Sequence, residues 1–220
     1  MGKETEQKQE IVNQGVHTYS QEEAYVWPEE PVLREQLEWF QDQKLALMVH
    51  WGVYNQLGMV ASWALSDEDA EWSRKTMDWT DDGEVFKRQY RALNRAFDPV
   101  AFQPEEWAKM AKKCGFRYLI LTTKHHDGFC LWDTAYTEYK TTAEECPFHT
   151  HKYADIVRAM FDAFRKEGLG IGAYFSKADW HCPDYWEKEK VFTGKTTRNP
   201  TYDPKENPEA WERFRAFTRD

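Results

Sequence analysis

The sequence has no excess of basic residues and no long apolar run. Its 220 residues include 29 Lys and Arg against 38 Asp and Glu, a formal net charge of −9. This balance argues against a nucleic-acid backbone or an anionic membrane as the main partner. No apolar stretch approaches the roughly 20 residues that a bilayer-spanning helix needs. We therefore expect a globular chain, long enough for one sizeable domain, that binds neither nucleic acid nor membrane.

Paired cysteines are also lacking. The four cysteines, Cys114, Cys130, Cys146 and Cys182, are far apart and form no Cys-x-x-Cys pair. Neither a zinc site nor a disulfide framework is therefore indicated. Cys114 falls on the apolar face of an expected helix, where we predict a small buried side chain.

Several cofactor and nucleophile motifs are absent as well. The sequence has no Gly-x-Gly-x-x-Gly, no P-loop and no Gly-x-Ser-x-Gly elbow. Its one His-x-His, His149-Thr150-His151, stands in a polar segment before a helix, where a solvated loop is the simpler interpretation than a metal site. We expect no metal and no cofactor.

Aromatic residues, in contrast, make up 16% of the chain, with 11 Trp. Indole offers a flat apolar face and a single N–H donor, which suits both large cores and sugar-binding sites. Composition alone leaves both uses open.

Apolar periodicity divides the chain into residues 1–28, an N-terminal segment, and residues 29–220. A helix is expected from Pro31, with Leu33, Leu37 and Phe40 on one face. Buried strands are expected near 45–49, 118–123 and 171–175, and helices near 104–114, 156–167 and 208–218. The polar stretch from about 55 to 98 predicts an elaborated loop with short helices.

The repeated order of helix, Gly, short loop, apolar strand and polar cluster is typical of an α/β fold with a parallel sheet. A (β/α)8 barrel needs eight strands and about 250 residues, whereas only three strands are recognisable. We therefore predict the N-terminal part of a TIM-like (β/α) barrel, with residues 29–220 ending before strand 4. An intact small open sheet is the alternative.

Polar side chains follow each expected strand, at the edge where α/β folds build their sites. His50 follows the first strand, and His125 and His126 follow the second. Adjacent residues point in different directions, so two neighbouring imidazoles share a site only if the backbone turns, and Gly128 makes such a turn cheap. Neutral imidazoles with Tyr and Trp suit a polyhydroxylated neutral ligand. Structural histidines are the alternative.

With these residues in place, the sequence resembles the α-L-fucosidases of glycoside hydrolase family 29. The resemblance runs from about Trp39 to Trp180. It rests on these stretches: His50-Trp51-Gly52 with the following Val53-Tyr54, Phe97-Asp98-Pro99, Glu106-Trp107-Ala108, Thr122-Thr123-Lys124-His125-His126-Asp127-Gly128-Phe129, Leu131-Trp132-Asp133, Asp162-Ala163-Phe164-Arg165, Tyr174-Phe175-Ser176 and Asp179-Trp180.

The resemblance implies a sugar pocket. It implies that His50, His125 and His126 bond fucose hydroxyls and that Tyr174 lines the same pocket. The family has a Glu-Trp pair in the loop after the first strand, and here the pair is Ser62-Trp63. Trp63 is kept as a candidate substrate-binding residue, while the loss of Glu at position 62 bears on substrate preference and activity.

The resemblance also implies a retaining exo-glycosidase that releases terminal α-L-fucose from a fucosylated oligosaccharide or glycoconjugate without a cofactor. Such a mechanism needs two carboxyl groups about 5 Å apart, and the family's nucleophile and acid/base positions are expected beyond residue 220. Asp127 is expected to be an orienting or structural group. The resemblance favours a periplasmic or secreted location, although residues 1–11 contain no apolar signal-peptide core. A non-catalytic sugar-binding protein and a glycosidase of other specificity remain as alternatives.

Overall fold

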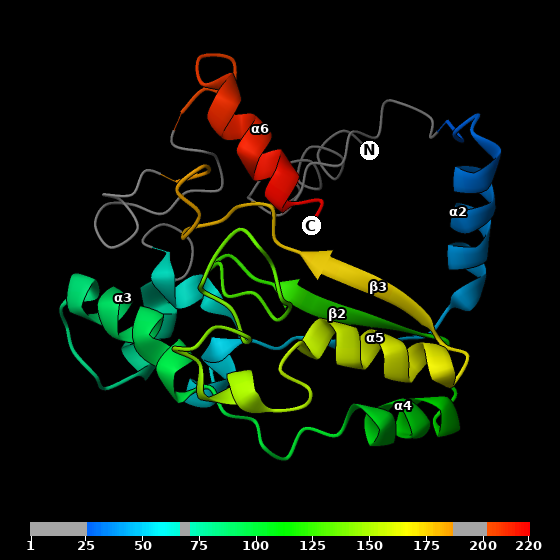
Figure 1. Ribbon diagram of the computed structural model, residues 1–220, viewed down its shortest axis with the longest axis horizontal. Helices are drawn as coiled ribbons and strands as arrows, with labels where there is room; N and C mark the ends of the chain where they lie inside the picture. Colours follow the sequence, from blue (N-terminus) through cyan, green and yellow to red (C-terminus); the bar gives the residue numbers. More distant parts are fainter. Residues whose placement is uncertain (1–25, 67–70, 187–201) are drawn as a thin grey trace, which may run out of the picture. The chain divides into compact units, whose positions relative to one another are not determined.

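The computed structural model describes residues 26–66, 71–186 and 202–220, whose course Figure 1 shows. The chain divides into two compact units, Met1–Asp42 and Gln43–Asp220. Most of the expected N-terminal segment, residues 1–25, lies outside the described residues. Helix α2 follows over Pro31–Gln43, and it begins at the proline where the sequence predicts a helix start.

A three-stranded sheet organises the second unit. Its strands are β1 (Ala46–Val49), β2 (Tyr118–Lys124) and β3 (Gly170–Phe175). They are parallel and adjacent in the order β1-β2-β3. The predicted α/β class and the three predicted strands are thereby confirmed, with bounds that differ by one residue.

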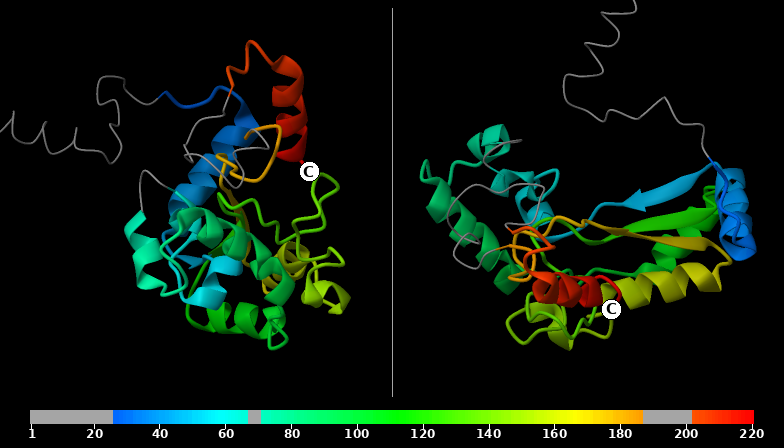
Figure 2. Two further views of the ribbon diagram at one scale, coloured as in Figure 1. Left: turned by 90° about the vertical axis from the view of Figure 1, so that its left-hand side faces the viewer. Right: turned by 90° about the horizontal axis from the view of Figure 1, so that it is seen from above.

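Two helices connect these strands and lie side by side along the sheet (Figures 1 and 2). Helix α4 runs over Pro104–Lys113 and α5 over Ile156–Lys166. The side chain of Asp155 accepts from the backbone N–H of Arg158 and so caps the start of α5. Gly115 follows α4 with φ +83°, a left-handed conformation that glycine adopts without steric cost.

The polar stretch after β1 is built from short helices, as the sequence predicts. The elements of this stretch are the 3₁₀ helices η1 (Val53–Leu57), η2 (Ser62–Leu65), η3 (Glu71–Thr76) and η4 (Ala92–Ala96), with the α-helix α3 (Gly83–Arg91) between the last two. A further 3₁₀ helix, η5 (Pro147–Thr150), precedes α5, and α6 (Pro208–Phe217) follows β3.

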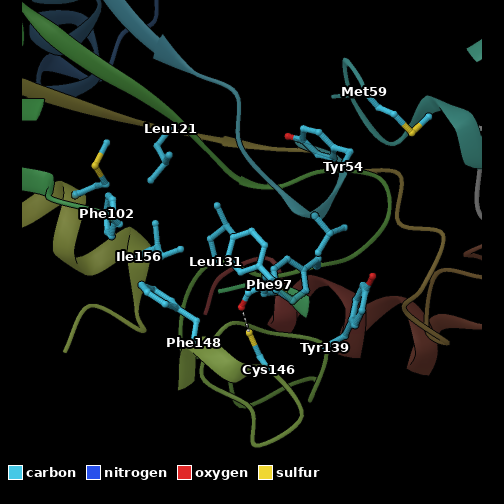
Figure 3. Close-up of a cluster of buried hydrophobic side chains, with 14 of the residues drawn as sticks. Tyr54, Met59, Phe97, Phe102, Leu121, Leu131, Tyr139, Cys146, Phe148 and Ile156 are labelled. Carbon is cyan, nitrogen blue, oxygen red and sulfur yellow. Dashed lines mark hydrogen bonds between the residues drawn. The ribbon is translucent and has the colours of Figure 1, made fainter. Parts of the chain in front are cut away.

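One hydrophobic core joins the sheet to these loops. Leu119 and Leu121 of β2 are fully buried in it, and aromatic side chains from the loops pack around them. Figure 3 shows part of this cluster, including Phe97, whose carbonyl lies within 3.4 Å of the Cys146 thiol. Many of the aromatic residues therefore serve packing, which is one of the two uses that composition leaves open.

Two burial predictions were wrong. Leu45 is 47% exposed and Met48 of β1 is 49% exposed, although the apolar run predicts a strand buried on both faces. Side chains of a strand point to the two faces of the sheet, and the described residues leave the face that carries Met48 partly uncovered. Cys114, which follows the end of α4 at Lys113, is exposed, whereas the buried positions of this helix are Pro104, Ala108 and Ala111.

No helix in the described residues is long and apolar enough to cross a membrane.

Candidate functional site

The backbone changes direction where β2 ends. Thr122 pairs with Tyr174 and Lys124 pairs with Phe175, so β2 carries one residue more than β3 at this point. Such a bulge re-aims the side chains that follow it. A turn closed by the N–H of Gly128 on the carbonyl of His125, at 3.1 Å, comes next. The bulge and the turn together allow His125 and His126 to face one region. The sequence predicts the turn from Gly128, whereas it does not predict the bulge.

All five candidate substrate-binding residues meet at the carboxyl edge of the sheet. The ring centroids of His50 and His125 are 5.0 Å apart, and those of His125 and His126 are 4.6 Å apart. The Trp63 ring lies 4.9 Å from that of His126, edge to face. The Tyr174 ring is parallel to that of His125 at 6.3 Å. We call these five residues the imidazole cluster. His125 is buried, whereas the other four are half-buried and keep an exposed side.

His50 is held by a tyrosine four residues further along the chain. Its Nδ1 lies 2.7 Å from the hydroxyl of Tyr54, which belongs to η1 and is fully buried. Burial raises the pKa of Tyr54 well above its usual value, so this hydroxyl keeps its proton. Burial also lowers the pKa of His50, which favours the neutral imidazole.

His125 is held by Ser62. The hydroxyl of Ser62, at the start of η2, forms a short hydrogen bond with Nδ1 of His125. Ser62 has no exposed surface and His125 keeps 3%. Burial, followed by the nearby charges of His126, His50 and Lys124, lowers the pKa of His125 to about 2. This imidazole is therefore neutral throughout the physiological pH range.

His126 is held by the segment after β3, residues 176–182, which we call the β3 loop. Nδ1 of His126 donates to the carbonyl of Ala178 at 2.8 Å, and the Trp180 ring stacks on the imidazole at a centroid distance of 4.9 Å. The N–H of Trp180 also donates to the carbonyl of His126 at 2.8 Å. The orientation of His126 thus depends on the position of the β3 loop.

A buried ion pair fixes the β3 loop. Lys124 Nζ lies 2.9 Å from Asp179 Oδ2, and both side chains are sealed from solvent. The same ammonium donates to the carbonyl of Ser176 at 2.8 Å. Asp179 Oδ1 accepts from the N–H groups of His181 and Cys182. Burial alone would raise the pKa of Asp179, but the charge and hydrogen bond of Lys124 hold it below its usual value.

Asp127 is buried in the turn after the cluster. Its carboxylate accepts from the Tyr90 hydroxyl at 2.8 Å and from the N–H of Phe129 at 3.0 Å, and Arg91 donates to its backbone carbonyl. Burial outweighs these bonds and raises the pKa of the carboxyl. These contacts tie α3 to the His125–Gly128 turn and fit the structural role expected for Asp127.

The His-x-His pair lies apart from this cluster. Nδ1 of His149 contacts the Cys146 carbonyl at 2.7 Å, and His151 stacks on Phe148 at a centroid distance of 4.5 Å. Within the described ranges, no three His, Cys, Asp or Glu side chains are grouped so that they could hold a metal ion. Both histidines therefore have local structural contacts.

Sequence patterns do not indicate the long-range contacts that hold His125 and His126. Ser62 is 63 residues from His125, and Ala178 is 52 residues from His126. The contact of Tyr54 with His50 is the local one of the three, because these residues are four positions apart in the sequence.

A cavity of about 620 Å³ lies elsewhere, between α5, β3 and α6, with Phe161, Phe175 and Phe217 among its lining residues. It contains Thr123 but none of the imidazole cluster. The convergent polar groups lie at the cluster and not in this cavity.

Comparison with known proteins gives a consistent result. The family model described as Alpha-L-fucosidase matches residues 12–220. The tissue alpha-L-fucosidase of Macaca fascicularis is 28% identical over 171 residues, which cover 75% of this chain and 36% of that protein. The putative alpha-L-fucosidase 1 of Oryza sativa subsp. japonica is 35% identical over 150 residues, which cover 68% of this chain and 23% of that protein.

Solved structures agree. An alpha-L-fucosidase GH29 from Bacteroides thetaiotaomicron superposes with a TM-score of 0.59 at 28% identity, covering 93% of this chain and 40% of that one. The unliganded alpha-L-fucosidase AlfC from Lactobacillus casei gives a TM-score of 0.54 at 30% identity, covering 80% of this chain and 52% of that one. The chain spans about a third of the length of several curated relatives that it matches.

Proposed function

The chain belongs to the α-L-fucosidase family, and from that premise we propose that the whole protein hydrolyses terminal α-L-fucosides of oligosaccharides or glycoconjugates. The observation that carries the proposal is the convergence of His50, His125, His126, Trp63 and Tyr174 at the carboxyl edge of a parallel sheet. Fucose is a neutral polyhydroxylated ring with a methyl group. Neutral imidazoles bond hydroxyls, and aromatic faces take up the apolar surface of the ring.

The proposal includes a barrel. The sheet β1-β2-β3 forms the first strands of a (β/α)8 barrel, whose sites lie at the carboxyl ends of the strands. The half-buried side chains of the imidazole cluster are placed at that end, which supports this arrangement.

The proposed mechanism retains the anomeric configuration. It uses one carboxylate as nucleophile and a second carboxyl as acid/base, about 5 Å apart. Asp127 and Asp179 are unsuited to either role, because each is buried. Asp127 bonds one backbone N–H group and the Tyr90 hydroxyl, and Asp179 bonds two backbone N–H groups and pairs with Lys124. The resemblance to the family implies that both catalytic carboxyls lie after residue 220, and the proposal includes this placement. The described residues bind and orient the sugar.

The test is hydrolysis of an aryl α-L-fucoside by the whole protein and by His125→Ala, His126→Ala and Trp63→Ala. Loss of one imidazole leaves a sugar hydroxyl unpaired in a desolvated site, which costs about 1–3 kcal/mol. We expect kcat/KM to fall roughly tenfold to a hundredfold for each histidine. His149→Ala is the matched control, because it removes a half-buried histidine outside the cluster.

Thermal melts of each variant separate loss of binding from loss of folding. If the parent binds L-fucose without hydrolysing any fucoside, the protein is a sugar-binding protein and the hydrolase proposal fails. If the cluster variants melt and cleave like the parent, these residues are structural and do not contact the sugar.

A further inference from the structure

Nothing in the chemistry of a sugar site requires a serine behind one of its histidines, yet Ser62 is fully buried with its hydroxyl on Nδ1 of His125. A neutral imidazole carries its proton on one nitrogen and presents a lone pair on the other. Whatever bonds one nitrogen therefore decides whether the other donates or accepts.

The direction of this hydrogen bond follows from counting donors. In the part of the chain that the structure describes, the Ser62 hydroxyl has His125 Nδ1 as its one partner. If Nδ1 carried the proton, the serine proton would be buried without an acceptor, at a cost of about 1–3 kcal/mol. The serine therefore donates, Nδ1 accepts, and the ring proton lies on Nε2.

Nε2 of His125 is placed to use that proton. It has no protein partner within residues 26–66, 71–186 and 202–220, and it is not among the unpaired polar atoms that are sealed from solvent. The nitrogen thus keeps access to a ligand on the side of the ring away from Ser62. A ligand oxygen there would accept a hydrogen bond from Nε2–H.

A serine bonded to a histidine also raises the question of a nucleophile. In a serine nucleophile pair the hydroxyl bonds Nε2 of the histidine, and a carboxylate holds Nδ1. Here the hydroxyl bonds Nδ1 and is buried, and the histidine is too weak a base to accept its proton. Ser62 therefore acts through His125 rather than on a substrate.

We propose that Ser62 is a positioning residue that fixes His125 in the Nε2–H tautomer, so that this imidazole is a permanent hydrogen-bond donor to an acceptor oxygen of the ligand. Tyr54 acts on His50 in the same way, because its buried hydroxyl has Nδ1 of His50 as its partner. The imidazoles of His50 and His125 then each present an Nε2–H donor to the ligand. The site selects a ligand with two acceptor oxygens spaced to match rings 5.0 Å apart.

The ligand part of this proposal rests on the proposed function, whereas the tautomer does not. The tautomer is read from ¹⁵N spectra of the whole protein with labelled histidines and no sugar present. We expect the parent to show the proton of His125 on Nε2 alone. In Ser62→Ala the preference should be lost, with both tautomers in exchange, and the affinity for L-fucose should fall roughly five- to tenfold.

Two variants guard against a merely structural effect. Ser62→Thr keeps the hydroxyl and should restore both the tautomer and the affinity. Ser66→Ala deletes a buried serine hydroxyl close by while leaving the Ser62–His125 bond in place, and it should leave the His125 spectrum unchanged. Tyr54→Phe should alter the spectrum of His50 and not that of His125.

The outcomes separate the two claims. A parent protein whose His125 carries its proton on Nδ1, or a Ser62→Ala variant with unchanged tautomer and affinity, overturns the role of Ser62 and leaves the proposed function standing. A protein with the expected tautomers that binds no fucose overturns the proposed function and leaves the assignment of Ser62 in place.

Discussion

Replacing Lys124 by Met should destabilise the protein and weaken sugar binding together. Met has a similar length but no charge, so the Asp179 carboxylate would stay buried without its cation. Breaking a buried pair from one side costs about 3–5 kcal/mol. Because whole domains are stable by about 5–15 kcal/mol, this is a large part of the margin.

The same substitution affects the proposed sugar site through the β3 loop. Lys124 also donates to the Ser176 carbonyl, and the loop supplies the Ala178 carbonyl and the Trp180 ring to His126. Once the loop loosens, His126 loses its fixed orientation. We expect the affinity for L-fucose to fall several-fold in Lys124→Met even under conditions where the variant remains folded.

The assay is urea unfolding of the whole protein, followed by tryptophan fluorescence, together with fucose titration. The double variant Lys124→Met/Asp179→Asn should recover part of the stability, since the amide is uncharged and still accepts from the loop N–H groups. A loss of unfolding free energy below about 1 kcal/mol for Lys124→Met would refute the reasoning, because a buried carboxylate without its cation destabilises the folded state by several times that amount.

The pH dependence gives a second check. The pKa of Asp179 is below its usual value in the folded state, so the pair stabilises the protein above the unfolded-state pKa of about 3.9. That stabilisation is lost as the pH falls through the lower folded-state pKa. The stability difference between parent and Lys124→Met should thus be constant near neutrality and shrink in acid. A difference that grows in acid would contradict this sign.

Three further predictions concern the same region. Gly128→Ala should cost more than about 2 kcal/mol, because a Cβ at φ +81° would lie 2.5 Å from Cβ of His181 and 2.8 Å from Asp179 Oδ1; an unchanged melting temperature would contradict this. Tyr90→Phe should cost about 1–3 kcal/mol by removing the hydroxyl that bonds the buried Asp127 carboxylate, as measured by urea unfolding; a cost near zero would show that this bond is dispensable. Dialysis against a chelator should leave fucoside hydrolysis unchanged, since two carboxyls suffice for the reaction, whereas loss of activity that zinc restores would favour a metallohydrolase.

The sequence predicted those features that depend on residues close together in the chain. Helix α4 and its ending near Gly115 follow from a proline, an apolar stripe and a glycine cap, and each strand follows from a short apolar run. The positions of His50, His125 and His126 follow from the rule that parallel strands gather their polar ends at one edge.

Features that depend on pairing between residues far apart in the sequence could not be predicted. The bulge before His125 is a property of the register between β2 and β3, which neither strand encodes alone. The same holds for Ser62 on His125 and for Lys124 on Asp179, whose partners meet only in the folded chain. The exposure of Met48 depends on what covers the face of the sheet at β1, which its own apolar run does not specify.

The most direct test of the proposed sugar site is a crystal structure of the whole protein with L-fucose bound. We expect fucose at the imidazole cluster, with acceptor oxygens within about 3.2 Å of Nε2 of His50 and His125, and with the sugar ring or its methyl group against Trp63. Fucose bound instead in the cavity beside Phe217, with the imidazoles free of sugar, would contradict it.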